Sequence, residues 1–426
     1  MKRSALLTVA LVVASFSFVS CGSSVNVPKP PSTLTERVFA SQSASSPTAA
    51  SGLIIVDGYD DTLGRGGVST AGSPGLMVTT PERATVLAVD SISNKVDVVG
   101  TEKETLTGSI QLPGPTTSIV APQSAVGYAA VPSAPLIGLP PGGVVEMNLT
   151  SGGITATISV PNAQTVVSNP GGSQLLVFSN DSDNVTVVSP ALQSSGNPVT
   201  FIVPLCTGCR PVNAIFSPDG GTAYILNCGA ECQGTQASVQ VLNLATTPPS
   251  LGASVPVDGA TIAFLSGSTL YVAGSPPVNN ACAGETTAAT TCGRLDIVDT
   301  GSMTVTSSVV ITDGYHDRID MGLGGQLFVG SHTCTNIGNV NNPTGEVRGC
   351  LSIYNTTTGA VVVPPDNGDV TGLQSFSSRY VEYVAEGGNL RVYDTTIDSL
   401  LINDYISNGT IIITGVITDV KAVDFF

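Results

Sequence analysis

Short segments of apolar residues recur along nearly the whole chain, and turns rich in Gly, Asn and Asp separate them. The clearest unit begins with VNAIFSPDGGTAYILN (212–227), continues with SVQVLNL (238–244) and ends near GASVPV (252–257). Short apolar or alternating runs between such turns are typical of antiparallel strands. The unit therefore predicts four short strands in succession.

This unit repeats along the chain. Segments similar to its first strand lie at 76–82, 117–123, 165–172, 261–267, 318–324, 373–379 and 420–426. Its second strand recurs at 37–42, 85–91, 126–132, 174–180, 269–275, 326–332 and 380–386, and its third at 52–59, 95–102, 143–150, 184–190, 294–300, 350–356 and 389–395. A period of about 42–56 residues with four strands per unit is typical of a β-propeller. We therefore expect an all-β propeller of four-stranded blades.

The two ends of the chain complement each other. The N-terminal region supplies a second strand (37–42), a third strand (52–59) and a weak fourth strand (66–72), but no first strand. The C-terminus supplies a lone first strand, VKAVDFF (420–426). Joining the two ends predicts eight blades and a ring that is closed by the C-terminal strand. Seven blades is the alternative, with the N-terminal unit as an extension.

An Asp or Asn ends the third strand in most units. These residues are Asp57, Asn148, Asn243, Asp299, Asn355 and Asp394. Their short side chains can accept hydrogen bonds from backbone N–H groups two residues further on, which starts a turn. We interpret this recurrence as structural, although it resembles a scatter of acidic sites.

Composition narrows the function classes. Hydrophobic residues make up 42% of the chain, charged residues 11% and aromatic residues 5%, and Trp is absent. This is too apolar for a disordered chain and too poor in Glu, Lys and Arg for a helical bundle. The net charge of −16 would repel phosphate backbones, so we expect no nucleic-acid partner.

The N-terminus has the pattern of an exported protein. Lys2 and Arg3 precede a short apolar run (4–20), so residues 1–20 are predicted to be a signal peptide. The following FVSC (18–21) resembles a bacterial lipobox, which implies cleavage before Cys21 and acylation of that cysteine. Residues 21–32 are then a Pro/Ser linker, and residues 33–426 a single propeller domain. Cleavage nearby with release of a soluble product is the alternative.

Eight further cysteines follow, in close consecutive pairs. They are Cys206, Cys209, Cys228, Cys232, Cys282, Cys292, Cys334 and Cys350. An even number on an exported chain predicts disulfides, here local ones. All eight fall in blade-to-blade links or in loops between second and third strands. Because neighbouring strands are antiparallel, these two kinds of loop emerge on one face.

CTGC and CGAEC also resemble paired zinc knuckles, but thiolate ligands require a reduced state, so we expect no metal there.

The segment DGYHDRID (313–320) contains the densest group of charged residues. His316, Asp317, Arg318 and Asp320 are the candidates for acid–base chemistry at the mouth of the central channel. A solvated link with a local ion pair is the alternative.

The carboxylates in DGYDD (57–61) and NDSDN (180–184) are dense enough to allow a bound calcium ion, although turn chemistry explains both segments. No GxSxG, HExxH or P-loop pattern occurs in the sequence, and no cofactor is expected.

The repeat resembles the YVTN-type propeller repeat. SPDGGTAYILN with VQVLNL, and TLYVAGS (269–275) with LDIVDT (295–300), carry the likeness. The resemblance implies the propeller architecture and no particular activity. The absence of Trp argues against WD-type repeats and against a quinone-cofactor propeller.

These observations predict a monomeric, lipid-anchored protein of the bacterial cell envelope, at the outer membrane or the cell surface. We expect its cysteine-rich face to bind a protein, a glycan or a small ligand, and expect contact with the membrane only through the lipid. A hydrolase or lactonase-like enzyme with its site in the central channel is the alternative. A purely structural envelope component is the third hypothesis.

Overall fold

The computed structural model describes residues 33–43, 51–179, 182–190, 198–276, 292–334, 349–364, 368–406 and 408–424. The chain divides into a first unit, residues 1–31, and a second unit, residues 32–426. The predicted signal peptide, Cys21 and the linker to residue 32 lie outside the described residues. In the described part, no helix has the length and apolar character needed to span a membrane.

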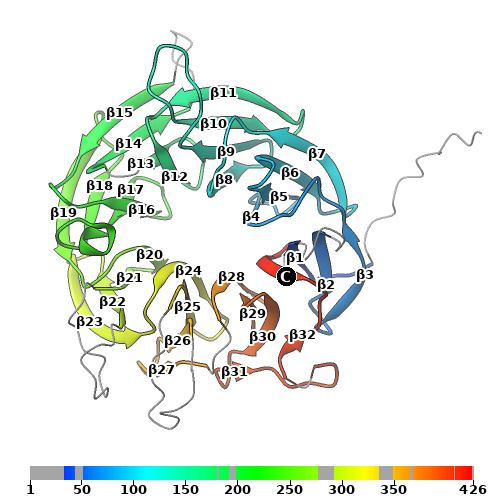
Figure 1. Ribbon diagram of the computed structural model, residues 1–426. Coiled ribbons are helices and arrows are strands. Elements are labelled where there is room, and N and C mark those ends of the chain that lie inside the picture. Colours follow the sequence, from blue (N-terminus) through cyan, green and yellow to red (C-terminus); the bar gives the residue numbers. More distant parts are fainter. Residues whose placement is uncertain are drawn as a thin grey trace, which may run out of the picture. The chain divides into compact units, whose positions relative to one another are not determined.

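The second unit is built from eight antiparallel sheets arranged around a central axis (Figure 1). Blade 1 contains β4 (Met77–Thr79), β5 (Thr85–Asp90), β6 (Lys95–Gly100) and β7 (Thr105–Gln111). Blade 2 contains β8 (Ser118–Gln123), β9 (Val126–Val131), β10 (Gly143–Asn148) and β11 (Gly153–Ser159). Blade 3 contains β12 (Ala163–Ser168), β13 (Leu175–Ser179), β14 (Asn184–Ser189) and β15 (Val199–Pro204). Blade 4 contains β16 (Pro211–Phe216), β17 (Thr222–Asn227), β18 (Ser238–Asn243) and β19 (Ser250–Pro256).

The remaining blades follow the same order from the axis outward. Blade 5 contains β20 (Ile262–Ser266), β21 (Thr269–Gly274), β22 (Gly293–Asp299) and β23 (Thr304–Ile311). Blade 6 contains β24 (Tyr315–Met321), β25 (Gln326–His332), β26 (Leu351–Asn355) and β27 (Val361–Val362). Blade 7 contains β28 (Val370–Ser375), β29 (Val381–Glu386), β30 (Asn389–Asp394) and β31 (Ser399–Leu400), and β32 (Thr410–Ile411) also pairs with β30. Blade 8 contains β33 (Val416–Ala422), β1 (Arg37–Ser43), β2 (Gly52–Asp57) and β3 (Thr62–Val68).

Blade 8 joins the two ends of the second unit. β33 is its innermost strand and pairs with β1, with Ala40 opposite Val420 and Val38 opposite Ala422. The prediction of eight blades closed by the C-terminal strand is confirmed. The predicted fourth strand at 66–72 was misplaced, because β3 begins at Thr62, directly after the turn that follows Asp57.

The core lies between neighbouring blades. Leu176 and Phe178 of β13, for example, pack with Ala223 and Ile225 of β17 in one cluster of buried residues. The second and third strands of a blade are covered on both faces, which explains their continuous apolar runs. The fourth strand lies at the rim, and β19 has six exposed residues out of seven. Val, Leu and Ala are the commonest residues of these interfaces, and Phe and Tyr side chains, among them Phe178 and Tyr383, are buried with them.

The Asp and Asn residues that end the third strands form turns, as the sequence predicts. Asp57 Oδ1 accepts a hydrogen bond from Tyr59 N at 3.0 Å, and Asn243 Oδ1 accepts one from Ala245 N at the same distance. Asp299 accepts hydrogen bonds from both N and Oγ of Ser302. The oxygen atoms of these side chains are therefore hydrogen-bonded within their own turns.

Candidate functional site

One end of the propeller carries the described cysteines. Because strands alternate in direction, the blade-to-blade links and the loops between second and third strands share this end, which we call the cysteine face. The link between β15 and β16 contains Cys206 and Cys209, and the loop between β17 and β18 contains Cys228 and Cys232. Cys292 precedes β22, and the loop between β25 and β26 contains Cys334 and Cys350. Cys282 lies outside the described residues.

The disulfides of this face are local. Bonds join Cys206 to Cys209, Cys228 to Cys232 and Cys334 to Cys350, with Cα atoms 5.3, 5.6 and 5.7 Å apart. Cys292 is also disulfide-bonded. Each of the three bonds with both cysteines described closes a single link or loop.

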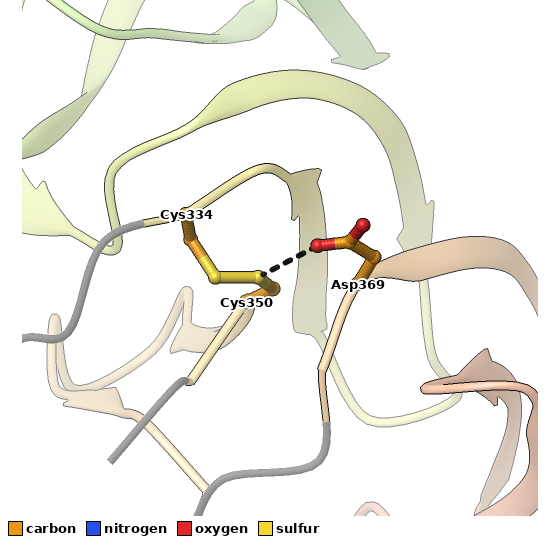
Figure 2. A group of neighbouring side chains, drawn as sticks. All are labelled: Cys334, Cys350 and Asp369. Atoms are coloured by element: carbon orange, nitrogen blue, oxygen red, sulfur yellow. Dashed lines mark hydrogen bonds between the residues drawn. A yellow bond between two sulfur atoms is a disulfide. The ribbon is translucent and has the colours of Figure 1, made fainter. Parts of the chain in front are cut away.

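Asp369 lies beside the Cys334–Cys350 disulfide (Figure 2). Its Oδ1 atom is 3.6 Å from Cys350 Sγ, and the same oxygen accepts a hydrogen bond from Thr333 N at 2.9 Å. This spacing would suit a metal ion, but the two sulfurs are bonded to each other and offer no thiolate. The carboxylate here orients the loop backbone.

The CTGC link packs against the loop that contains the Cys228–Cys232 disulfide. Cys228 N donates to Arg210 O at 3.0 Å, and Thr235 N donates to Gly208 O at 2.8 Å. Asp183, from the loop of blade 3, accepts hydrogen bonds from Gly208 N (2.8 Å) and Arg210 N (3.2 Å). These bonds hold the pKa of Asp183 below its ordinary value and fix Arg210 in a left-handed conformation, with φ of 53°.

The end of the axis on the cysteine face is hollowed. We call this cavity of about 260 Å³ the mouth hollow. Its polar and aromatic lining includes Gln164, Ser179, Ser182, Arg210, Cys232 and Tyr315. Because these residues come from blades 3, 4 and 6, the cavity forms only where these blades pack together.

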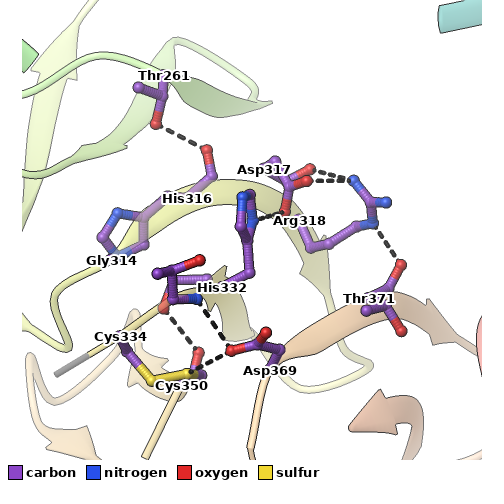
Figure 3. Close-up of polar contacts among 12 residues, drawn as sticks. Thr261, Gly314, His316, Asp317, Arg318, His332, Cys334, Cys350, Asp369 and Thr371 are labelled. Atoms are coloured by element: carbon purple, nitrogen blue, oxygen red, sulfur yellow. Dashed lines mark hydrogen bonds and ion pairs between the residues drawn. A yellow bond between two sulfur atoms is a disulfide. The ribbon is translucent and has the colours of Figure 1, made fainter. Parts of the chain in front are cut away.

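Asp317, Arg318 and His332 form a polar cluster (Figure 3), and Tyr315 of the mouth hollow contacts it through His332. Tyr315 and His332 face each other across β24 and β25, with ring centroids 5.3 Å apart. Asp317 lies between two basic groups, with Oδ2 3.0 Å from Arg318 Nη1 and Oδ1 3.6 Å from His332 Nδ1. The side chains of Asp317 and His332 are 31% and 39% exposed, so both reach solvent. Burial raises the pKa of Asp317, and the two basic groups oppose that rise.

His316 does not belong to this cluster. Its side chain is fully buried, its Nε2 atom lies 2.9 Å from Thr312 O, and its backbone oxygen accepts a hydrogen bond from Thr261 Oγ1 (Figure 3). Burial lowers the pKa of His316 to about 4, so the ring is neutral at physiological pH. The placement of His316 at the channel mouth was wrong, because strand alternation turns its ring into the protein interior.

Asp320 is separated from the mouth as well. Its Oδ2 atom accepts a hydrogen bond from Ser375 N of blade 7 at 2.7 Å, and its Oδ1 atom accepts one from Met321 N at 2.8 Å. Asp419 of β33 makes the matching contact with Met77 N of blade 1 at 2.7 Å. The sequence groups residues 316–320 together, but the extended strand spreads them along the axis, and Asp320 clamps neighbouring blades.

Three residues of the site, Glu231, Tyr315 and His332, were not among the candidates predicted from the sequence. Glu231 lies inside the Cys228–Cys232 loop, and its Oε2 atom accepts a hydrogen bond from Ser275 N at 2.8 Å. Burial raises the pKa of Glu231 to about 7. Tyr315 lies within DGYHDRID (313–320), next to the candidate His316, and His332 ends the predicted second strand at 326–332. The only signal for Glu231 was an acidic residue within a short disulfide-closed loop.

Comparisons with known proteins place the fold among propellers. No protein-family model matches the sequence, and no curated protein matches it either. The structure of the dihydro-heme d1 dehydrogenase NirN in complex with DHE is 13% identical, with a TM-score of 0.59 over 93% of this chain and 78% of that chain. The periplasmic gluconolactonase PpgL of Pseudomonas aeruginosa is 14% identical, with a TM-score of 0.52 over 91% and 98%. A functionally unknown protein from Desulfotomaculum acetoxidans is 10% identical, with a TM-score of 0.50 over 92% and 100%. At these identities the likeness shows the fold alone.

Proposed function

We propose that this protein is an extracytoplasmic binding module, anchored to the bacterial cell envelope through Cys21, whose cysteine face holds a small polar ligand in the mouth hollow. Disulfides on this face support an oxidising compartment. The comparison with a periplasmic propeller agrees with that location. The observation that carries the proposal is the mouth hollow itself.

The lining of the mouth hollow suits a sugar or another hydroxylated compound. Gln164, Ser179 and Ser182 offer amide and hydroxyl groups, and Arg210 offers a guanidinium group. Tyr315 adds an aromatic ring, which can stack on the apolar face of a sugar. A few polar groups that converge in a cavity fix the orientation and specificity of a small ligand. The volume of about 260 Å³ suits a ligand of about one sugar ring.

The backbone around the mouth hollow is held in place before any ligand binds. Two disulfides, the hydrogen bonds of Asp183 and the contact between the CTGC link and the neighbouring loop fix the position of Arg210. A site that needs no ordering on binding loses less conformational entropy. The described backbone around Arg210 therefore has the rigidity that ligand recognition requires.

A glycan array followed by calorimetry on the folded protein tests this proposal. Tyr315→Ala and Arg210→Met should each weaken binding of a hit by at least about tenfold, because each removes a wall of the cavity. Tyr380→Ala is the matched control, since Tyr380 is an exposed tyrosine in the β28–β29 turn at the opposite end. Equal affinity for the Tyr315 variant and the parent protein would contradict the assignment.

The lipid anchor has its own test. A Cys21→Ser variant should move from the membrane fraction to the soluble fraction, and mass spectrometry of the parent protein should detect an acylated N-terminal peptide. A signal peptide cleaved at another position, with an unmodified Cys21, would contradict this part of the proposal and leave the binding site untouched.

A second candidate function is hydrolysis of a lactone or an ester. The observation that favours it is the half-exposed pair formed by Asp317 and His332, which lies beside Tyr315 at the mouth hollow. A His held by a carboxylate can act as a general base. One structurally similar propeller is a gluconolactonase.

A screen with lactones and esters distinguishes the two functions. If the protein is an enzyme, His332→Gln and Asp317→Asn should each lower kcat by at least about a hundredfold, with little change in KM. Glu82→Gln, at an exposed position in the turn before β5, is the control. Turnover that survives in both variants would exclude this pair as the catalytic group.

A further inference from the structure

A second cavity lies on the cysteine face, between blades 4 and 5. We call this cavity of about 220 Å³ the inter-blade hollow. Glu231, Thr235, Gln236 and Asp258 contribute to its walls. Among the described residues that line it, no Lys, Arg or His occurs. The cavity therefore presents two carboxyl groups, from two different blades, without a basic residue in its wall.

Glu231 forms the deeper acidic wall. It lies in the single 3-10 turn Gly229–Cys232, which the Cys228–Cys232 disulfide closes, so its backbone position is fixed. Its Oε2 atom accepts a hydrogen bond from Ser275 N at the end of blade 5. Burial raises the pKa of Glu231 to about 7. The hydrogen bond from Ser275 N opposes that rise and is the smaller effect. A cation that enters the cavity would stabilise the ionised form of this buried carboxyl group.

Asp258 forms the acidic rim. Its side chain is 47% exposed, and its Oδ2 atom lies 3.6 Å from Arg294 Nε and 3.2 Å from Ser308 Oγ. Its backbone N–H donates to Asp296 Oδ2 at 2.7 Å, which anchors the link to blade 5. Asp258 keeps solvent contact in this arrangement, so it can still face a ligand at the opening.

We propose that the inter-blade hollow binds the protonated primary amino group of a small organic ligand, with Glu231 as the inner partner and Asp258 as the partner at the rim. A carboxylate and an ammonium group form charge-assisted hydrogen bonds, which are stronger than neutral ones. A cavity of about 220 Å³ exceeds the roughly 30 Å³ of a water molecule several-fold, so it suits an organic cation better than a bare ion.

Proton linkage gives this site a distinctive property. Bound ammonium favours the ionised form of Glu231, so affinity should rise as the pH rises through about 7, and binding near pH 7 should release a proton. The other charged and titratable groups near the site are Tyr315, whose pKa burial raises to about 12, Asp258 with its partner Arg294, and Asp296, whose pKa burial also raises. Tyr315 stays protonated over this pH range, and the Glu231→Gln variant distinguishes the titration of Glu231 from that of Asp296.

The inter-blade hollow is separate from the mouth hollow, although the Cys228–Cys232 loop borders both. The inference does not depend on what the mouth hollow binds. Ser179→Ala, which alters only the mouth hollow, should leave amine binding unchanged. If the parent protein binds an amine but no sugar, the proposed function is overturned and this inference stands.

Calorimetry with amine probes tests the inference on the disulfide-intact protein. D-glucosamine and Nα-acetyl-lysine N-methylamide represent the two sources of such an amine, an amino sugar and a lysine side chain. N-acetyl-D-glucosamine and the Nε-acetylated lysine derivative are their neutral controls. We expect at least one amine to bind and its neutral control to bind at least about tenfold more weakly, and the lysine derivative, whose amine stays protonated near pH 7, to release up to one proton.

Variants identify the group responsible. Glu231→Gln keeps the shape of the side chain and should weaken amine binding by at least about tenfold and abolish proton release, while Asp258→Asn should weaken binding less. Thermal melting checks that both variants are folded, and carbon-detected NMR of the Glu231 carboxyl reports its pKa directly. Amine binding that survives Glu231→Gln, a carboxyl signal unaffected by amine, or tighter binding of Ca²⁺ than of either amine would each overturn the proposal.

Discussion

At the scale of single residues, burial decides which ionisable groups are available for chemistry. Glu382 of β29 is fully buried. Burial raises the pKa of its carboxyl well above the ordinary value, nearby Asp320 raises it further, and Lys421 lowers it. The folded protein therefore favours the protonated carboxylic acid. Ionising Glu382 destabilises the folded state.

Glu382→Gln should make the protein more stable at high pH. In the unfolded chain a glutamate ionises near pH 4.5, so the parent loses folding free energy as the pH rises from there to the raised folded-state pKa. That loss is at most about 1.4 kcal/mol for each pH unit in this interval, and the uncharged glutamine removes it. Urea unfolding at pH 4.5 and pH 8 should show a gain only at pH 8. Glu82→Gln, at an exposed site, should show none at either pH.

His316 should remain neutral over most of a pH titration. His316 has a pKa of about 4, so its NMR signals should keep the pattern of a neutral ring from pH 8 down to about pH 5. Its Nε2 atom lies 2.9 Å from Thr312 O, which makes the Nε2–H tautomer the expected form. A His332→Gln variant assigns the signals, and a midpoint above pH 6 for His316 would contradict its enclosure.

At the scale of elements, one turn locks blade 8 to blade 7. Asp61, at the end of the β2–β3 turn, accepts hydrogen bonds from Arg379 Nη1 (3.0 Å) and Nη2 (2.8 Å) and from Asn403 Nδ2 (2.9 Å). Tyr383 Oη donates to it as well. The Asp61 side chain has no solvent exposure, so its charge depends entirely on these four donors. The acidic segment DGYDD therefore serves a contact between blades.

Asp61→Asn should destabilise the fold by about 3 kcal/mol, because it leaves the Arg379 guanidinium without its charged partner in a mostly buried position. Asparagine tolerates the left-handed backbone at this position, where φ is 56°. The substitution therefore removes the negative charge without straining the backbone. Urea unfolding gives the free-energy difference, with Asp60→Asn as the control. An unchanged midpoint would show that the ion pair adds no net stability.

At the scale of the whole molecule, the ring depends on one contact between the chain ends. β33 supplies the innermost strand of blade 8, and Asp424 receives hydrogen bonds from Arg37 N (2.7 Å) and Arg37 Nε (2.8 Å). Arg37 also lies 3.3 Å from Glu104 of blade 1. Because each blade buries its faces against two neighbours, opening this contact exposes the edge of β1 and the apolar residues around Val420.

Ending the chain after Gly415 should therefore affect the entire propeller. We expect the melting temperature to fall by more than about 10 °C and the protein to associate through the uncovered edge of β1. Differential scanning calorimetry and sedimentation velocity report these two effects. Arg37→Met, which removes the clamp but keeps β33, is the comparison and should lower the melting temperature by a few degrees. A truncated chain that melts like the parent would contradict closure by β33.

The sequence alone predicted the repeat, the number of blades, the pairing of the chain ends and the face on which the cysteines lie. These follow from local signals, because strand alternation, Asp or Asn turns and loop order are written within each unit of the chain. His316, Asp317, Arg318 and Asp320 show where such reasoning ends. The packing of neighbouring blades buries His316 and leaves Asp317 half-exposed, and no local pattern encodes that difference. Arg210 N likewise donates to Asp183 of blade 3, and Glu231 accepts from Ser275 of blade 5, so only the packing of successive blades brings these groups together and creates the two cavities.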